Sequence, residues 1–491
     1  YTAFYTLSLH DALPICHPDR RPVEVNPGAL RVSMAPGPRD AGMNDSVWSH
    51  LSGARWFGGK GRGGELRSLV LQNWIVEPGL SEGRLTTLGI APEIATISYP
   101  QGDVEHYLLL SSFSPEPDPR SLVGVSEHGF GGYRHDATRD PAAMQIVLSS
   151  LLEKRATESW RPTLTEACNL DATLPARVFT GQQSNTNVMF GDRAILKVFR
   201  KLEPGRNVDV VLHEALGRAG VSSVATLFGW VEGTIPTSAG SVGTDLAMLV
   251  ELLPDAADGW ERAVDACAAG RTFTDDAAAL GTALADVHHA LAASFPAASA
   301  SGDDLAETMG RRLDAALDEA PILSDAAPAL RALFDSLRGR TLPTQRVHGD
   351  FHLGQTLHTP QGWKIIDFEG EPMKPIEERR APDSAWRDVA GMLRSFSYAT
   401  SGHADPTGPV AQSWLADLRT AFLTAYSQGL GPADADVLAA YEADKAVYEV
   451  LYEIRNRPDW LPIPMTAILG YVGDNASPTT TSAPTDADTE N

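Results

Sequence analysis

Cysteine is scarce in this chain, and long apolar runs are absent. Its 491 residues include only three cysteines, Cys16, Cys168 and Cys267, which lie far apart. An odd number of isolated thiols argues against a disulfide framework and against a zinc site, so we expect a reducing cytoplasm. Because no run of about 18 apolar residues occurs, the sequence also predicts no membrane-spanning helix and no membrane partner.

Basic residues are too few to suit a nucleic-acid partner. The chain has 40 lysines and arginines against 63 aspartates and glutamates, which gives a net charge of −23. Binding a phosphate backbone requires clustered cations, and this composition does not supply them. The length exceeds one ordinary core, and at about 150 residues per domain it predicts about three domains.

The two ends of the chain differ in composition from the rest. Tyr5–Ile15 resembles a translated sequencing adapter and no methionine precedes it, so we expect the native start at Met34 or Met43 and treat 1–44 as a leader. Residues 474–491 are rich in threonine, serine, proline and aspartate, a composition typical of disorder.

Three segments are expected between these ends. Short strand-like stretches separated by glycine turns mark residues 45–155 as a small β-rich cap domain. Strands continue through 156–255, which we interpret as a second β-rich lobe. Residues 256–473 are predicted to be mainly helical, because apolar residues recur there at helical spacing.

The densest functional signal lies in Arg346–Pro372, which reads RVHGDFHLGQTLHTPQGWKIIDFEGEP. Asp350 follows a strand-like tripeptide and sits in a turn, where its carboxylate can accept a hydroxyl proton. Asp367 and Glu369 follow a second apolar strand. Side chains two apart in a strand share a face, so this pair can bind one divalent metal. Gln355, which lies between Asp350 and this pair in the sequence, offers a neutral oxygen ligand.

The order of base, amide ligand and acidic ligand is that of protein-kinase-like catalytic loops. His-Gly-Asp alone is common in turns, where it supplies geometry rather than chemistry. The catalytic interpretation is favoured because several candidate residues, rather than this tripeptide alone, occur in the expected order within one segment. Asp388, which precedes an apolar helix, is expected to brace the catalytic loop rather than to perform chemistry.

A nucleotide-binding half is predicted upstream. Lys197 lies on the second strand of a predicted hairpin, where it can reach phosphates or can be an ordinary solvated cation. The loop before this hairpin is rich in amide and hydroxyl groups, and Gln183, Ser184 and Asn185 could cover phosphates.

Two further elements complete that half. Glu214, in the helix predicted over 208–219, is the carboxylate expected to hold the lysine in a kinase-like fold, although glutamates on a helix surface are common. Val250, Glu251 and Leu252 end an apolar strand before a proline, the expected position of a hinge whose backbone faces an adenine.

With these residues in view, the chain resembles the bacterial maltokinase group, in particular its actinobacterial maltokinase and glucosamine kinase branches, with aminoglycoside phosphotransferases as wider relatives. The resemblance covers about residues 47–471. It is carried by Arg55–Phe57, Gln183–Thr186, Ile195–Arg200, Arg346–Pro372, Glu377–Ser384, Arg387–Met392, Asp444–Glu449 and Arg455–Pro462. It implies an α+β, bilobal protein-kinase-like fold with an extra N-terminal cap domain.

The resemblance also implies ATP and Mg²⁺ as the nucleotide and the metal. Its site residues would be Asp350 as the base, Gln355 and Asp367 as metal ligands, and Lys197 as the phosphate anchor. This chain departs from the family in one place, because maltokinases carry the helix glutamate one turn earlier, where Val211 stands. The lysine is then held either by Glu214 or in a different way.

The acceptor is expected to be a small sugar bound in the helical part. An aromatic ring among carboxylates and amides suits a saccharide, although such a cluster can also be a solvated helix end. The residues proposed to line it are His352, Asp444, Glu449, Glu453, Asn456 and Trp460. Maltose, giving maltose 1-phosphate, is the first expectation, and glucosamine, giving glucosamine 6-phosphate, is the alternative. A catalytically inactive kinase-like binding module stays open as a different class, and the oligomeric state is left open.

Overall fold

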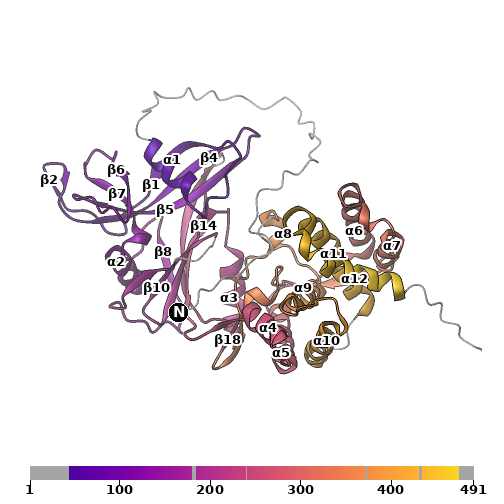
Figure 1. The fold of residues 1–491 in the computed structure, drawn as a ribbon. Helices are drawn as coiled ribbons and strands as arrows, with labels where there is room; N and C mark the ends of the chain where they lie inside the picture. Colours follow the sequence, from indigo (N-terminus) through magenta and orange to yellow (C-terminus); the bar gives the residue numbers. More distant parts are fainter. Residues whose placement is uncertain (1–43, 180–183, 239, 372–373, 431–433, 475–491) are drawn as a thin grey trace, which may run out of the picture. The chain divides into compact units, whose positions relative to one another are not determined.

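The computed structural model describes residues 44–179, 184–238, 240–371, 374–430 and 434–474. These residues form two compact units, the first ending at Ala256 and the second beginning at Ala257, and each is described by itself (Figure 1). The expectations for the leader before residue 44, for Gln183 and for the tail after Asp474 lie outside the described residues.

An antiparallel sheet of six strands forms the N-terminal part of the first unit. Its order is β1–β4–β5–β7–β6, and β12 pairs with β5. The strands are β1 (Glu65–Leu71), β4 (Gly89–Ser98), β5 (Val104–Ser114), β6 (Leu122–Val125), β7 (Tyr133–Asp136) and β12 (Lys201–Leu202). The short hairpin β2 (Leu80–Ser81) and β3 (Arg84–Leu85) and the helices α1 (Asn44–Gly53) and α2 (Pro141–Leu152) accompany it.

A second six-stranded sheet has the order β8–β13–β14–β11–β10–β9. Its strands are β8 (Arg161–Leu164), β9 (Ala176–Val178), β10 (Thr186–Phe190), β11 (Ala194–Val198), β13 (Leu227–Thr237) and β14 (Gly240–Glu251), and α3 (Val208–Arg218) packs against β13. The predicted hairpin is confirmed as β10–β11, with Asn187 opposite Lys197.

The two sheets of the first unit share a hydrophobic core. Strand β4 is buried along nearly its whole length, and its alternate residues face two different apolar clusters. Ala95 packs with α1, whereas Ile94 joins Leu196 and Met248 of the second sheet in one continuous cluster. The segments 45–155 and 156–255 are therefore held together by common apolar packing.

The second unit is mainly helical. Its helices are α4 (Gly259–Ala268), α5 (Thr274–Ser294), α6 (Gly302–Glu319), α7 (Ala327–Asp335), α8 (Ile376–Arg380), α9 (Trp386–Ala399), α10 (Pro409–Leu430), α11 (Ala435–Asn456) and α12 (Pro462–Asp474). It also contains two small sheets. One consists of β15 (Ala257–Asp258), β18 (Thr356–Thr359) and β19 (Gly362–Ile365), and the other of β16 (Ala298–Ser301) and β17 (Thr341–Thr344).

Helix α9 is central to the packing of this second unit. All its residues from Asp388 to Ala399 are buried, and it contacts α10 and α11. Helices α5 and α10 also pack closely. A Cβ atom on Gly281 of α5 would lie only 2.4 Å from the carbonyl oxygen of Phe422 on α10. Glycine is needed there for the close approach of two backbones. The carboxylate of Asp388 is thus presented from a rigid, fully packed element.

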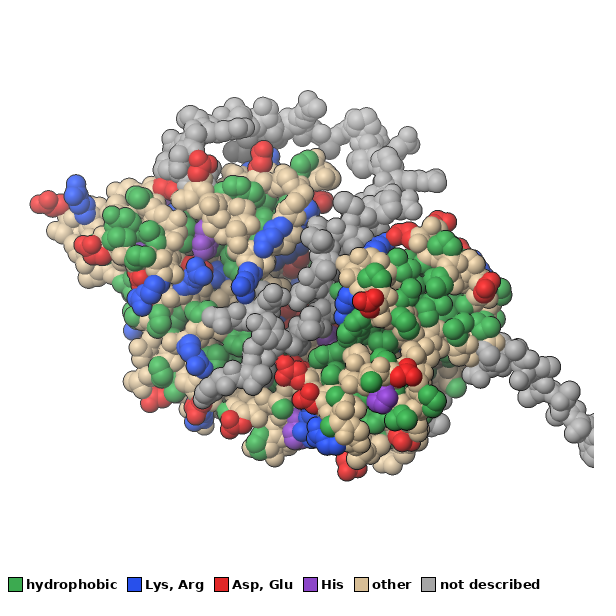
Figure 2. All heavy atoms as spheres, in the orientation of Figure 1, with side chains coloured by type: hydrophobic (Ala, Val, Ile, Leu, Met, Phe, Trp, Pro, Cys, Tyr) green, Lys and Arg blue, Asp and Glu red, His purple; other side chains and the backbone are tan. Residues whose placement is uncertain are grey.

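The described surface mixes charged and apolar side chains. Figure 2 shows acidic and basic side chains scattered among apolar ones over the visible face. None of the helices among the described residues is both long enough and apolar enough to span a bilayer.

Candidate active site

The His-Gly-Asp turn of the second unit has a conformation that requires glycine at its centre. Gly349 has φ +85°, and a Cβ atom there would lie 3.4 Å from the Cα atom of Gly370. Asp350 follows and is only 9% exposed. The strand-like tripeptide before it belongs to no sheet, because the β17 strand ends at Thr344 and only an isolated bridge follows at Gln345.

Asp388 anchors this turn, as its position before an apolar helix predicts. Its Oδ1 accepts a hydrogen bond from the Gly349 N–H at 2.8 Å, and its Oδ2 accepts from the His348 N–H at 2.7 Å and from His288 Nε2 at 2.9 Å. Burial alone would raise the pKa of Asp388, but the hydrogen bond from His288 and the neighbouring charges lower it. Asp388 therefore stays ionised and holds two backbone amides of the turn in place.

His348 links the turn to the strand that precedes the metal-ligand candidates. Its Nδ1 accepts from the Asp350 N–H at 3.3 Å, and its Nε2 donates to the carbonyl oxygen of Ile366 at 2.9 Å. The two bonds fit one neutral tautomer. The ring also packs against Phe368, with ring centroids 4.8 Å apart. This structural role was missed in the sequence, where only its place beside Gly349 marked the residue.

The two segments that carry the metal-ligand candidates are joined at the end of β19. The Ile366 N–H donates to the carbonyl oxygen of Gln355 at 3.0 Å, which ties the two segments together. The prediction that Asp367 and Glu369 lie on one face of a strand is wrong. The strand ends at Ile365, and Asp367 has a φ of +65°, outside the range of a strand. A non-glycine residue in this left-handed region is strained, and such strain is typical of functional sites.

The donor set at these positions suits a hard cation. Carboxylate oxygens of Asp367 and Glu369 and the amide oxygen of Gln355 are ligands that Mg²⁺ prefers. Gln355 is 6% exposed and ends a single 3₁₀ turn. His352, expected to contact the sugar, caps that turn instead, because its Nδ1 accepts from the Gly354 N–H at 3.1 Å.

In the first unit, Lys197 is held by Asp209. The lysine Nζ lies 2.8 Å from Oδ2 of Asp209, and His213 Nδ1 lies 2.9 Å from Oδ1. Asp209 is buried, which alone would raise its pKa, but the charge of Lys197 and then that of His213 lower it well below the usual range. The lysine is thus positioned by an ionised carboxylate on the first turn of α3.

The prediction that Glu214 pairs with Lys197 is wrong. Its carboxylate instead contacts two arginines, Arg206 at 3.4 Å and Arg218 on the next turn. Glu214 lies five residues after Asp209, so it projects from a different side of α3. Glu214 is the carboxylate in the interior of α3, whereas the partner of Lys197 lies in the first turn, two residues after the capping residue Asn207.

The remaining nucleotide candidates are only partly available. Ser184 is exposed, and Asn185 uses its Oδ1 to accept from the Arg200 N–H at 3.3 Å. The N–H groups of Glu251 and Leu252 donate to carbonyl oxygens within the unit at 2.8 and 3.0 Å, and Val250 pairs within the sheet. The expected hinge can therefore not offer the amides of Glu251 and Leu252 to an adenine.

Two carboxylates predicted to line the sugar site are structural instead. Glu449 is 2% exposed and lies 2.7 Å from Nη2 of Arg394 on α9. Glu453 is fully buried and accepts from Tyr398 at 2.9 Å and from Arg457 at 2.7 Å. These residues are four apart on α11, so both face the interior of the helical unit.

The other acceptor candidates lie nearer the surface. Asp444 pairs with Arg312 at 2.5 Å, and its Oδ1 is buried without a hydrogen-bond partner among the described residues. Trp460 stacks on Tyr398, and the Asn456 side chain donates to a backbone carbonyl of its own helix. Of the expected set, Asp444 Oδ1 and Glu449 Oε1 are both buried without a hydrogen-bond partner among the described residues, and of these two only the Asp444 side chain is partly exposed.

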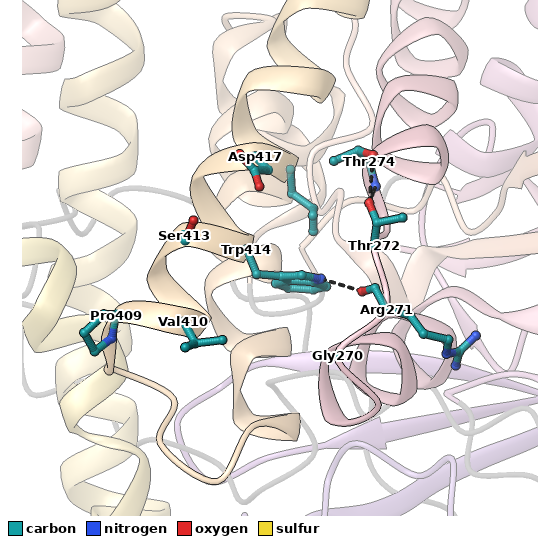
Figure 3. A pocket seen from close by; sticks show the side chains of 10 residues that line it. Gly270, Arg271, Thr272, Thr274, Pro409, Val410, Ser413, Trp414 and Asp417 are labelled. Atoms are coloured by element: carbon teal, nitrogen blue, oxygen red, sulfur yellow. Dashed lines mark hydrogen bonds between the residues drawn. The ribbon is translucent and has the colours of Figure 1, made fainter.

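A separate hollow on the helical unit contains none of the predicted residues. It has a volume of about 480 Å³ and lies between the α4–α5 connection and the start of α10 (Figure 3). The indole of Trp414 projects across it, and its Nε1 donates to the carbonyl oxygen of Arg271 at 2.9 Å. This hollow is distinct from the turn that carries Asp350.

Comparisons with known proteins place the chain among phosphotransferases. A family model described as a phosphotransferase enzyme family matches residues 175–441, more than half of the chain. A glucosamine kinase of Streptacidiphilus jiangxiensis is 31% identical over 384 residues, covering 70% of this chain and 84% of the relative. A glucosamine kinase of Mycolicibacterium smegmatis is 29% identical over 329 residues, covering 61% and 80%.

Solved structures show the same fold. A glucosamine kinase in complex with glucosamine, ADP and inorganic phosphate has a TM-score of 0.63 at 24% identity, covering 88% of this chain and 99% of that chain. A glucosamine kinase in its crystal form B has a TM-score of 0.64 at 23% identity, covering 87% of this chain and 99% of that chain. The expected bilobal protein-kinase-like fold is confirmed.

Replacing the two carboxylates of α3 one at a time separates their roles. We expect Asp209→Asn to weaken ATP binding about tenfold, because it removes the charge that positions Lys197. The matched variant Glu214→Gln should leave ATP affinity within about twofold of wild type, since its partners are surface arginines. Calorimetric titration of both variants with ATP measures the difference. The reverse order of effects would restore Glu214 as the partner.

A second pair of variants tests the structural role of Glu449. We expect Glu449→Gln to lower the free energy of unfolding by about 3 kcal/mol, because Arg394 would keep a buried charge without its counterion. The control Glu319→Gln breaks a surface ion pair with Arg455 and should cost at most about 1 kcal/mol. Denaturant titration measures both. An unchanged stability together with a raised KM for the sugar would return Glu449 to the acceptor site.

Proposed function

Because this chain belongs to the phosphotransferase enzyme family, we propose that it is a glucosamine kinase, which transfers the γ-phosphoryl group of ATP to glucosamine and forms glucosamine 6-phosphate. The observation that carries the proposal is the 31% identity to a glucosamine kinase over 84% of that relative's length. The chain is a carbohydrate kinase. Its relatives favour glucosamine, the alternative acceptor, over maltose, the first expectation from the sequence.

Asp350 is the proposed base. In the reaction, the sugar hydroxyl oxygen forms a bond to the γ-phosphorus while the bond from that phosphorus to the β,γ-bridging oxygen breaks, which releases ADP. The hydroxyl proton passes to the carboxylate of Asp350. Phosphoryl transfer has a loose transition state, so alignment matters more than strong base catalysis. The hydrogen bonds of the turn to Asp388 and His348 support this role by fixing the backbone of Asp350.

Gln355, Asp367 and Glu369 are the residues proposed to hold Mg²⁺. The ion, when bound, would neutralise negative charge on the phosphates of the nucleotide. Lys197, held by Asp209, is proposed to bind phosphate oxygens, since its ammonium is oriented by a buried carboxylate. Support for the metal assignment comes from the all-oxygen donor set and from the strained backbone at Asp367.

Asp444 is the proposed acceptor-site residue, because its side chain is 14% exposed whereas that of Glu449 is 2% exposed. Its buried Oδ1 has no hydrogen-bond partner among the described residues, and a buried carboxylate oxygen is costly to leave unpaired. The ammonium group or a hydroxyl group of glucosamine could donate to it. An amino sugar also fits the carboxylate charge better than a neutral disaccharide does.

An acceptor panel tests the proposed reaction. We expect Mg²⁺-dependent transfer from ATP to glucosamine with a kcat/KM at least about tenfold above that for glucose, maltose and aminoglycosides, because a carboxylate pairs with an ammonium group. Product analysis by mass spectrometry and NMR identifies the phosphorylated hydroxyl. Preferred transfer to maltose would make the chain a maltokinase, and ATP binding without transfer to any sugar would favour the inactive binding module.

Asp350→Asn tests the base. We expect kcat to fall about a hundredfold or more, because the sugar hydroxyl loses its positioned proton acceptor. The control Asp335→Asn removes an exposed carboxylate of α7 and should leave kcat within about twofold of wild type. Steady-state rates are compared at saturating ATP. Near-normal turnover of Asp350→Asn would remove this residue from the mechanism.

A further inference from the structure

We propose that Arg200 is a positioning residue for nucleotide binding, which ties the start of β10 and the end of β11 to the N-terminal sheet of the first unit. The proposal rests on the proposed function, because it takes the segment before β10 and Lys197 on β11 as the phosphate side of the nucleotide site. It gives the N-terminal sheet a part in phosphate binding.

Arg200 has the contacts of a buried junction. It follows Lys197 by three residues and is 1% exposed. Its Nε donates to Thr186 Oγ1 at 2.7 Å, and its backbone N–H donates to Asn185 Oδ1 at 3.3 Å. Thr186 begins β10, and Asn185 is the last of the loop residues that the sequence assigns to phosphates. One residue therefore fixes that end of the loop relative to the strand of Lys197.

The other donors of the same guanidinium point into the N-terminal sheet. Nη1 donates to the carbonyl oxygen of Leu108 on β5 at 3.2 Å. Nη2 donates to Thr138 Oγ1 at 2.8 Å and lies 3.1 Å from Oδ2 of Asp136, at the end of β7. The guanidinium has five N–H donors in one plane, so it can donate to acceptors on several elements at once, whereas a lysine ammonium cannot.

Asp136 supplies the opposing charge. It is 5% exposed, and burial alone would raise its pKa, but the charge of Arg200 and then the His50 ring, whose Nε2 lies 3.6 Å away, lower the pKa well below the usual range. Its Oδ1 also accepts from the Thr138 N–H at 3.1 Å. The ionised carboxylate is thus fixed by its own backbone turn, which makes it a rigid anchor for the guanidinium.

Trp56 closes the junction from a third direction. The indole lies over the guanidinium, with the Arg200 Cζ 4.8 Å from the ring centroid, a distance typical of a cation–π contact. Trp56 belongs to the Arg55–Phe57 motif, for which the proposed reaction offers no role. We infer that this motif supplies the aromatic cover of Arg200.

Arg134 is a matched control in the same unit. It is also fully buried and also pairs with a buried carboxylate, since its Nε and Nη2 lie 2.9 and 3.1 Å from the oxygens of Glu93. Its other contacts, with Glu127, His128 and the ring of Phe113, are to the N-terminal part of the unit. Arg134 therefore matches Arg200 in burial and charge without touching the start of β10.

The experiment compares Arg200→Lys with Arg134→Lys in the full chain. We expect Arg200→Lys to raise the Kd for ATP and the KM for ATP about tenfold, because Asn185 and Lys197 would be displaced relative to the phosphates, while the KM for glucosamine stays within about twofold. Arg134→Lys should lower the melting temperature without changing the Kd for ATP. The Kd is measured by calorimetry without sugar.

Asp136→Asn keeps the test decisive if Arg200→Lys does not fold. This variant preserves side-chain shape, removes only the anchoring charge, and should shift the Kd for ATP in the same direction. The proposal is overturned if the folded variants of Arg200 and Asp136 bind ATP as wild type does, or if Arg134→Lys weakens ATP binding equally. Failure of the wild type to phosphorylate glucosamine would reject the proposed acceptor, whereas the Kd comparison would still decide the role of Arg200.

Discussion

The hydrogen bonds of the buried Asp388 carboxylate are the interactions on which the turn with the proposed base depends. The carboxylate accepts hydrogen bonds from the amides of His348 and Gly349 and from the ring of His288, in a place where those groups could not reach water. Helix α9 is buried on all sides from Asp388 onward, so the turn that it holds before Asp350 is fixed to the packed helical core. A proposed base is thereby held by backbone geometry.

The same frame extends to the proposed metal ligands. His348 bonds to the carbonyl oxygen of Ile366, and the amide of Ile366 bonds to Gln355, so the base turn and both ligand segments share one hydrogen-bonded network. Such a frame is fixed before any substrate binds. Phosphoryl transfer benefits from this arrangement, because most of its barrier is lowered by alignment and by charges that need not reorganise.

Paired buried charges perform the corresponding task in the first unit. Asp209 holds Lys197 and His213, and Asp136 holds Arg200. Each carboxylate keeps its charge despite burial because a cation lies within hydrogen-bond distance. The two sheets share one apolar core, whose close packing resists displacement of either sheet. The charged pairs are therefore held in fixed positions.

The sequence by itself determined the hairpin that carries Lys197 and the turn that carries Asp350, because alternation, turn residues and short motifs act over neighbouring residues. The hairpin, the family and the fold are confirmed. Only the tertiary structure decided which charges pair. Asp209 rather than Glu214 meets the lysine, and Glu449 faces the core instead of a sugar, because such pairing depends on how each helix is rotated against elements distant in the chain.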